Sequence, residues 1–415
     1  MATESTTRRL VRTGTAPVAP VGRGTFTALT SEICRDPDRF GALAAEWTAL
    51  HRRCATATPF QSHAWLHSWW LSYGTPGRLR VVLVRRGGTL VAAAPLTLVH
   101  RPFPVLVQLG GSISDFSDVL LDDDCADSAA QALAKALATA ARTAVIDLRE
   151  VRPGAAAERV YDCWDGARDR LVDSLCLELP AVPMDELLGR LPSSRAQRAR
   201  AKIRKIDSLG IEERVVPVDE VPTAVARLLQ LHRLQWQGRG VTPEHLSARF
   251  AEHLTRSARS MVECGDAMVT EFRLAGEVVA ADLTLMSPRL AGGYLYGADP
   301  MLRDRKVDVA TMLLRESARR ISGGGAGGAG GVGGCTTLSM LRGNEPYKHH
   351  WRPETVCNQR LLLARALLAP SLRLVAARAA ARGRAAVLVN ERLPAMKAGL
   401  ARRTRRGDGK GRPGT

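Results

Sequence analysis

The sequence lacks closely spaced cysteine pairs, although it contains eight cysteines among 415 residues. No C-x-x-C motif occurs, and the cysteines are scattered over positions 34, 54, 125, 163, 176, 264, 335 and 357. This spacing argues against a zinc ribbon and against a disulfide framework. We therefore expect reduced thiols, a cytoplasmic location and no bound metal.

Long hydrophobic runs are also missing. The longest apolar stretch, residues 90–99, is too short to span a bilayer and contains Pro95. Residues 1–25 contain several arginines but no apolar segment, so we predict a disordered N-terminal tail and no signal peptide. Residues 323–334 are rich in glycine but lack the G-x-x-x-x-G-K-S/T order of a phosphate loop, which predicts a flexible joint and not a nucleotide site.

The residues that are present suit a soluble globular protein with room for two domains, because 45% are hydrophobic and 24% are charged. The net charge of +18 is concentrated in two segments. Residues 371–415 contain twelve Lys or Arg and two acidic residues, and residues 195–205 contain six Lys or Arg and no acid. The rest of the chain is nearly neutral, so its fold is not predicted to be a platform for nucleic acid.

The C-terminal basic segment distributes its apolar residues like a helix. Beyond Pro370, the spacing of Leu372 and Val375 among many arginines predicts an amphipathic helix, followed by a disordered end after about residue 402. Such a segment could lie on an anionic membrane surface or could be a polar tail.

Two segments resemble each other and predict a duplicated α/β unit. Residues 81–99 and residues 268–286 each suggest a strand, a turn with glycine, and a strand of small residues ending in Leu-Thr-Leu. A helical region with tryptophan precedes each segment, and a further strand and a helix follow it. The matching order favours two copies of one unit.

A basic helix is predicted between the two copies, over residues 194–209. Ser193 or Ser194 can cap its start, and Gly210 can end it. Its cations share one face at positions 195, 198, 202 and 205. The helix could be a phosphate-binding arm or simply a solvated amphipathic helix.

A basic turn follows the last hairpin of the second copy. Arg303, Arg305 and Lys306 come directly before a predicted helix, and Asp308 is the expected N-cap. Free backbone N–H groups and the helix dipole favour anions at such a position. The turn could therefore hold a pyrophosphate, and the alternative is an ordinary basic loop.

The densest group of polar side chains is the segment 342–351, Arg-Gly-Asn-Glu-Pro-Tyr-Lys-His-His-Trp. The β-prone residues 335–341 precede it, and Gly343 and Pro346 turn the chain where that strand ends. Polar groups on a loop held by a strand end often form a site, and the alternative is a solvated turn.

This order of elements resembles the acyltransferases of the CelD/BcsL type, which are tandem-GNAT-fold proteins associated with cellulose biosynthesis and related in architecture to the Fem-type aminoacyl transferases. The motif Arg-Gly-x-Glu-Pro-Tyr-Lys-x-x-Trp contributes most, and the resemblance spans about residues 30–365. In the N-terminal half, residues 58–70 look like the aromatic helix of the family and residues 109–118 like its Gly-then-Asp turn. The resemblance implies an α/β (α+β) fold of two GNAT-like acyl-CoA N-acyltransferase units in tandem, with mixed sheets flanked by helices.

The implied activity is transfer of an acyl group from acetyl-CoA or another acyl-CoA to an amine or hydroxyl. The acceptor would be a small molecule, a saccharide or a cell-envelope precursor. Such a reaction needs a base for the acceptor, a proton for the leaving thiolate and groups that position both substrates. Glu345 or one of the two histidines could be the base, and Tyr347 could protonate the thiolate.

The candidate residues fall into three groups by expected role. The catalytic candidates are Glu345, Tyr347, His349 and His350. The cofactor-binding candidates are Arg303, Arg305, Lys306 and Asp308, and the substrate-binding candidates are Arg342, Lys348, Asp115 and Asp118. Each of these side chains has a plain alternative role as a surface charge, a turn former or a cap for a buried ring.

Two features depart from the family pattern. Family members tend to have an acidic residue in the strand before Arg-Gly, where this sequence has Ser339. The Arg/Gln-x-x-Gly-x-Gly/Ala loop of ordinary GNAT enzymes is also absent, so residues 303–308 would have to replace it.

Two other functions compete with the acyl-CoA hypothesis. One is a Fem-type transferase that uses aminoacyl-tRNA, which the basic helix favours and the lack of a long paired-helix insertion disfavours. The other is a non-catalytic partner of a polysaccharide synthesis complex, docked at the inner face of the membrane through residues 371–415. We predict an N-terminal domain over residues 26–183, an acyltransferase domain over 184–366, and a basic tail over 367–415.

Overall fold

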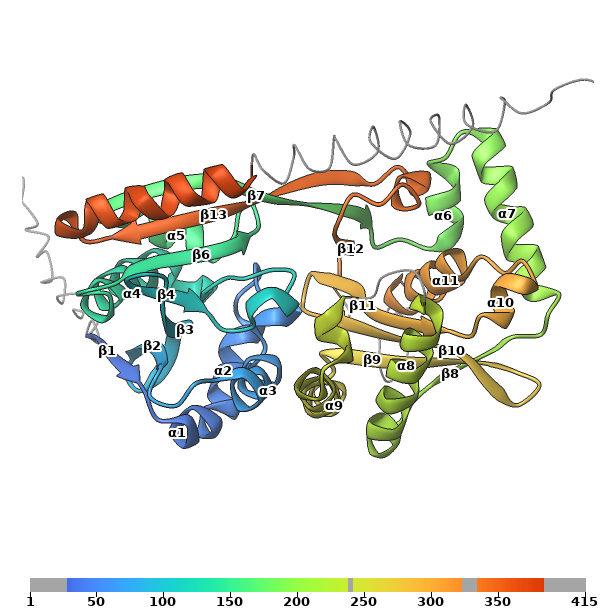
Figure 1. Cartoon of the computed structure of the whole chain (residues 1–415), viewed down its shortest axis with the longest axis horizontal. Coiled ribbons are helices and arrows are strands. Elements are labelled where there is room, and N and C mark those ends of the chain that lie inside the picture. Colours follow the sequence, from blue (N-terminus) through green and yellow to red (C-terminus); the bar gives the residue numbers. More distant parts are fainter. Residues whose placement is uncertain (1–27, 238–241, 323–333, 384–415) are drawn as a thin grey trace, which may run out of the picture.

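The computed structural model describes residues 28–237, 242–322 and 334–383. These residues form a 13-stranded sheet in the order β1-β2-β3-β4-β6-β13-β7-β12-β11-β10-β9-β8, with β5 paired to β3. Helices pack against the sheet in both halves of the molecule (Figure 1). The predicted N-terminal tail, nearly all of the glycine-rich joint and the end of the basic tail lie outside the described residues.

The N-terminal half runs from β1 to β7. Its elements are β1 (Leu29–Cys34), α1 (Pro37–Ala42), α2 (Ala44–Arg52), α3 (His63–Tyr73), β2 (Leu79–Arg86), β3 (Thr89–His100), β4 (Pro104–Gln108), β5 (Leu120–Leu121), α4 (Ala126–Ala140), β6 (Val145–Val151), α5 (Ala156–Asp162) and β7 (Ala167–Pro180).

The C-terminal half begins at α6. Its elements are α6 (Met184–Gly189), α7 (Ser193–Asp207), β8 (Glu212–Val215), α8 (Val221–Trp236), α9 (Ala248–Glu263), β9 (Ala267–Leu274), β10 (Glu277–Met286), β11 (Leu290–Ala298), α10 (Met301–Asp304), α11 (Val309–Ser322), β12 (Thr337–Arg342), η6 (Lys348–Trp351) and β13 (Glu354–Ala364). A further helix covers residues 369–383.

The predicted duplication is confirmed by the strand pairing. In the first half β1, β2, β3 and β4 pair antiparallel in sequence order, and β4 pairs parallel with β6. In the second half β8, β9, β10 and β11 repeat the antiparallel order, and β11 pairs parallel with β12. Both predicted hairpins are present, as β2–β3 and β9–β10. The fold is therefore α/β with two like units in tandem.

The two halves exchange their last strands. β7 ends the first half but pairs antiparallel with β12 of the second, and β13 ends the second half but pairs antiparallel with β6 of the first. The two exchanged strands also pair with each other from Ala167–Ala364 to Glu178–Glu354. They run side by side along the upper edge of the view in Figure 1, from one half to the other, and join the halves into one sheet.

Helix packing reinforces this union. Trp65 of α3 is fully buried, and its Nε1 donates to Ser114 Oγ at 2.8 Å. Ser68 on the same helix donates to the carbonyl of His253 in α9 at 2.9 Å, and Tyr294 of β11 donates its hydroxyl to the carbonyl of Ile113 at 2.9 Å. The aromatic helix of the N-terminal half is thus core, as expected for large apolar rings.

Three features differ from the sequence prediction. Neither predicted serine caps α7, because the helix begins at Ser193 and Pro192 is its N-cap residue, with a carbonyl that accepts from the amides of Arg195 and Ala196. α9 was not predicted, although its buried residues Phe250, Leu254 and Met261 follow helical spacing. The exchanged strands β7 and β13 were not predicted either.

The C-terminal helix of residues 369–383 uses its apolar face for packing. Leu372, Val375 and Ala376 are buried and form a cluster with Val145 of β6 and Leu362 of β13. Within the described residues this face therefore covers the sheet, and membrane docking by the basic tail stays a prediction. No helix of residues 28–237, 242–322 and 334–383 combines the length and apolar character that a membrane span needs.

Candidate functional site

The two parallel strands of the second half separate part-way along their length. β11 and β12 pair only from Leu290–Thr337 to Gly292–Ser339, whereas β11 continues to Ala298. β12 bends away toward β7 after Ser339, where its register with β7 shifts and Leu341 takes a left-handed φ of 60°. A strand that leaves its neighbour opens space between the two at the sheet surface.

Two adjoining hollows occupy this space and extend it over α11. The outer hollow, about 360 Å³, lies between α7, the start of α11 and η6. The inner hollow, about 110 Å³, lies over β10, β11 and β12. Ala310, Tyr347 and Trp351 line both hollows and join them. We call the two together the α11 groove.

Cations of α7 line the outer hollow. Arg195, Arg198 and Lys202 lie on the same helix face as predicted, and all three are exposed. Lys202 Nζ pairs with Asp308 Oδ2 at 2.6 Å, whereas neither arginine has an ion-pair partner among the described residues. Asp308 Oδ1 also accepts from the amide of Thr311 at 2.9 Å, which confirms it as the cap of α11. The outer hollow thus combines unpaired guanidinium groups with a helix start, an arrangement that favours phosphate.

A buried carboxylate lines the inner hollow. Asp282 of β10 is 6% exposed, and its Oδ2 accepts from Thr284 Oγ1 at 2.7 Å. A Cβ built on Gly293 of β11 would lie 3.3 Å from Asp282 Oδ1, so the absence of a side chain at Gly293 leaves this oxygen uncovered. Burial raises the pKa of Asp282 to about 6, with a smaller contribution from Glu316. A carboxyl in this state can exchange a proton near neutral pH.

The loop after β12 brings Tyr347 and Lys348 to the groove. Tyr347 lines both hollows and is 44% exposed as a whole residue. Partial desolvation of its hydroxyl raises its pKa to about 12, with smaller contributions from Tyr296 and Glu345. Lys348 is 5% exposed, and its Nζ donates to the carbonyl of Arg342 at 2.9 Å and pairs with Glu345 at 2.8 Å. These two bonds of Lys348 hold the loop against the end of β12. They thereby fix the position of Tyr347, which lies between Glu345 and Lys348 in the chain.

Arg342 joins the two halves and does not line the groove. Its Nε donates to Asp115 at 2.7 Å, its Nη1 to Glu150 at 3.0 Å, and its Nη2 to the carbonyl of Ser112 at 2.9 Å. Two of the predicted substrate-binding residues, Arg342 and Asp115, are therefore partners of each other. Their contact holds the start of the loop against the N-terminal half.

Asp118 is fully enclosed beneath α5. Its carboxylate accepts from the backbone amides of Val119, Ala156 and Ala157 at 2.7 to 3.0 Å. Burial raises its pKa to about 7, against these three donors, which lower it. This geometry is that of a helix cap, and Asp118 does not line the α11 groove.

The remaining predicted residues divide between the groove and the surface. His350 lines the outer hollow, with its Nδ1 3.0 Å from the carbonyl of Tyr347. His349 is exposed and contacts Asn344, and Glu345 is exposed and paired with Lys348. The basic turn is also exposed and outside the groove, at Arg303, Arg305 and Lys306.

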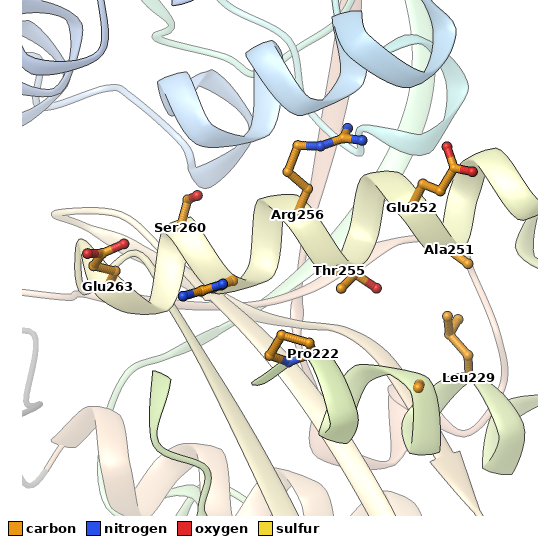
Figure 2. Close-up of a pocket in the computed structure, with 10 residues that line it drawn as sticks. Pro222, Leu229, Ala251, Glu252, Thr255, Arg256, Ser260 and Glu263 are labelled. Carbon is orange, nitrogen blue, oxygen red and sulfur yellow. The ribbon is translucent and has the colours of Figure 1, made fainter. Parts of the chain in front are cut away.

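A larger hollow of about 790 Å³ lies elsewhere, between α8 and α9 (Figure 2). Pro222 and Leu229 of α8 face Ala251 and Thr255 of α9 across it, while Arg256 points away toward α3 (Figure 2). The Arg256 guanidinium donates to Ser72 Oγ at 3.2 Å in that helix. This hollow is open and brings no buried titratable group together with a cation cluster, so the α11 groove is the better candidate site.

Comparison with known proteins identifies the domain that contains the groove. Residues 193–349 match the family model described as "Acetyltransferase (GNAT) domain". These residues form a GNAT-type acetyltransferase domain. The match includes α7, α11, β10, β11, β12 and most of the loop with Tyr347. A search of curated proteins found no match.

Solved structures show the same fold over most of the chain. "Crystal structure of FemX" aligns with a TM-score of 0.53 at 12% identity, over 76% of this chain and 94% of that chain. A conserved protein of unknown function from Bacteroides thetaiotaomicron VPI-5482 aligns with a TM-score of 0.50 at 13% identity, over 78% and 97% of the two chains. At these identities the likeness concerns the fold. Because the first half repeats the strand order of the domain that matches the GNAT model, the fold is a tandem of two GNAT-like units.

The sequence hypothesis missed the buried carboxylate of the groove, Asp282. Asp282 aligns with Pro95 when the two Leu-Thr-Leu endings are superposed, so only the second copy has a carboxylate there. This difference between the two copies is the sequence signal that could have identified Asp282. In the described residues no group of three or more His, Cys, Asp or Glu is placed to hold a metal ion, and each of the eight cysteines is an unpaired thiol.

Proposed function

We propose that the protein is an acyl-CoA-dependent acyltransferase of the CelD/BcsL type, which moves an acyl group to an amine or hydroxyl in the α11 groove. The observation that supports this most is the groove itself. Within a GNAT-type domain, one end offers unpaired arginines at a helix start and the other offers a buried carboxylate and a tyrosine. Small-molecule, saccharide and cell-envelope acceptors all remain compatible with it.

The outer hollow suits the phosphates of the acyl donor. Arg195 and Arg198 can each make charge-assisted hydrogen bonds to phosphate oxygens, and the positive end of α11 adds to the attraction. Lys202, which already pairs with Asp308, fixes α7 beside α11. We assign the phosphates to these residues in place of the exposed turn at Arg303, Arg305 and Lys306.

The inner hollow suits the acyl end of the donor. Leu313, Leu314 and Trp351 supply an apolar lining next to the separated strands β11 and β12. Tyr347 stands where the two hollows meet, and its high pKa keeps its hydroxyl protonated and able to donate to the leaving thiolate. Holding donor and acceptor together there removes much of the entropic barrier to their reaction.

Ligand-induced thermal stabilisation tests the proposal. Acetyl-CoA and longer acyl-CoAs should raise the melting temperature of the full chain, since a ligand that binds only the folded state stabilises it. The double variant Arg195→Ala/Arg198→Ala should weaken acetyl-CoA binding by about a hundredfold, because each of the two lost charged contacts is worth roughly 1.5 kcal/mol, about tenfold in affinity.

The matched control is Arg303→Ala/Arg305→Ala, which removes the same charge outside the groove. It should bind acetyl-CoA like the unmodified protein. Loss of binding in the control alone would move the phosphates to the basic turn. No thermal shift with any acyl-CoA would reject the proposed function.

The same measurement separates the two competing functions. The exposed cations of α7 could also contact the backbone of aminoacyl-tRNA, in which case aminoacyl-tRNA and not acyl-CoA would raise the melting temperature. For a non-catalytic partner of a polysaccharide complex, neither acyl-CoA nor aminoacyl-tRNA would raise the melting temperature.

A further inference from the structure

We infer that Asp282 is the general base of the reaction, a catalytic residue that takes the proton of the acceptor from the floor of the inner hollow. This inference rests on the proposed acyltransferase function and names the residue that accepts the proton. The sequence pattern pointed instead to Glu345 or a histidine of the loop after β12.

The position of Asp282 is the first argument. Its side chain comes from β10 and reaches the groove beside Gly293 of β11, which has no side chain to cover it. Ser339 of β12 lines the same hollow on the other side of β11. The strand position where the family pattern expects an acid is thus occupied by a hydroxyl, and a carboxylate two strands away faces the same space.

The bonding of Asp282 is the second argument. Its Oδ2 is engaged by Thr284, and its Oδ1 has no hydrogen-bond donor or ion-pair partner among the described residues. Lys348, the cation that lines the same hollow, already contacts Glu345 and the carbonyl of Arg342. A buried carboxylate without a cation gains stability from any proton it receives, which is what a base needs.

The surroundings of Asp282 set its proton affinity. It lies opposite Thr270 of β9 and Tyr296 of β11, and Glu316 of α11 raises its pKa further. Tyr347 and Lys348 face the hollow from the loop. Burial is the largest cause and places the pKa at about 6, so the carboxylate is available as a base at neutral pH.

The transfer then balances as follows. The acceptor nitrogen or oxygen bonds to the thioester carbonyl carbon, and its proton moves to Asp282 Oδ1. The carbon–sulfur bond breaks, and the CoA thiolate takes a proton from the Tyr347 hydroxyl, which regains one from solvent as Asp282 releases its own. The products are the acylated acceptor and free CoA thiol.

Release of free thiol from acetyl-CoA tests this assignment, with glucosamine as a probe acceptor and with water alone. Asp282→Asn should lower the release rate by about a hundredfold or more, as expected for loss of a general base. The melting-temperature shift given by acetyl-CoA should persist, since the donor phosphates bind elsewhere. The rate of the unmodified protein should rise with pH through about 6, and Asp282→Glu should restore part of the rate together with a pH-dependent profile.

Several outcomes would overturn the assignment. Equal thiol release by the Asp282→Asn variant and the unmodified protein would do so, including the case in which neither exceeds the uncatalysed rate. Loss of the acetyl-CoA shift in the variant alone would make Asp282 a binding or structural group. By contrast, if acetyl-CoA does not raise the melting temperature of the unmodified protein, the proposed function itself is rejected.

Discussion

At the scale of single residues, Asp282 shows that a buried carboxylate suited to proton transfer lowers the stability of the folded protein. Asp282 has a folded-state pKa of about 6, above the ordinary value of 3.8, because burial disfavours its charged form. The folded state therefore binds a proton that the unfolded state releases, and stability falls as pH rises from about 4 to about 6. Above about pH 6 the stability of the folded state stays lowered by the whole unfavourable free energy of burying the charged carboxylate.

Replacing this carboxylate should stabilise the protein at neutral pH. Asp282→Asn keeps the bond from Thr284 and removes the charge, so the free energy of unfolding at about pH 7.5 should rise by up to about 3 kcal/mol. At about pH 4 the difference should nearly vanish. Urea unfolding at the two pH values measures this, and a variant less stable at both would contradict a raised pKa of Asp282.

At the scale of elements, short polar contacts fix where helices begin. Asp118 accepts from two amides at the start of α5, and Asp308 accepts from one at the start of α11. The first of these was a candidate for substrate binding, and its three amide bonds leave it little capacity to contact anything else. We expect it to act through α5 alone.

The substitution Asp118→Ala should test this structural role. It leaves two buried amides at the start of α5 without acceptors, so the protein should lose about 1–2 kcal/mol of stability or more. Asp118→Asn retains an acceptor oxygen and also removes a charge whose burial is unfavourable, so it should lose less. Thermal unfolding measures both losses. An unchanged melting temperature combined with a raised KM for the acceptor would instead support substrate binding.

At the scale of the whole molecule, the halves are held by strand exchange and by a polar junction. Arg342 pairs with Asp115 and Glu150, and Asn358 of β13 donates to Glu150 at 3.2 Å. These residues come from both halves and surround the point where β6, β7, β12 and β13 meet. The loop that contains Tyr347 starts from this junction, so its position depends on both units.

Removing Arg342 should therefore affect stability and the groove together. In Arg342→Met, Asp115 loses its cation and the buried Glu150 keeps only Arg149 among the described cations, at 3.8 Å. The loss should cost about 2–3 kcal/mol, a value discounted because Arg342 is partly exposed. Urea unfolding should report this loss, and acetyl-CoA binding should weaken as the loop shifts.

The control is Arg159→Met, since Arg159 of α5 is 57% exposed and pairs with Asp127 at 2.6 Å, away from the junction. It should cost less than about 1 kcal/mol. Similar losses in the two variants would show that the junction has no special role in joining the halves.

The sequence by itself determined the local features. The hairpins, the basic helix, the capping of α11 by Asp308 and the repeat follow from alternation, helical spacing and turn residues, which are properties of neighbours in the chain. The polar loop after β12 was found for the same reason, and its Tyr347, Lys348 and His350 do line the groove.

Only the tertiary structure decided which groups meet. The exchange of β7 and β13 pairs residues that lie more than a hundred positions apart, and no local pattern specifies such partners. Packing between the halves brought Arg342 to Asp115 and Glu150. Packing within the second half placed the cations of α7 beside the start of α11 and left Arg303 and Arg305 at the surface. Asp282 became a candidate base only because Gly293 on the neighbouring strand leaves it uncovered, a condition set by packing across the sheet.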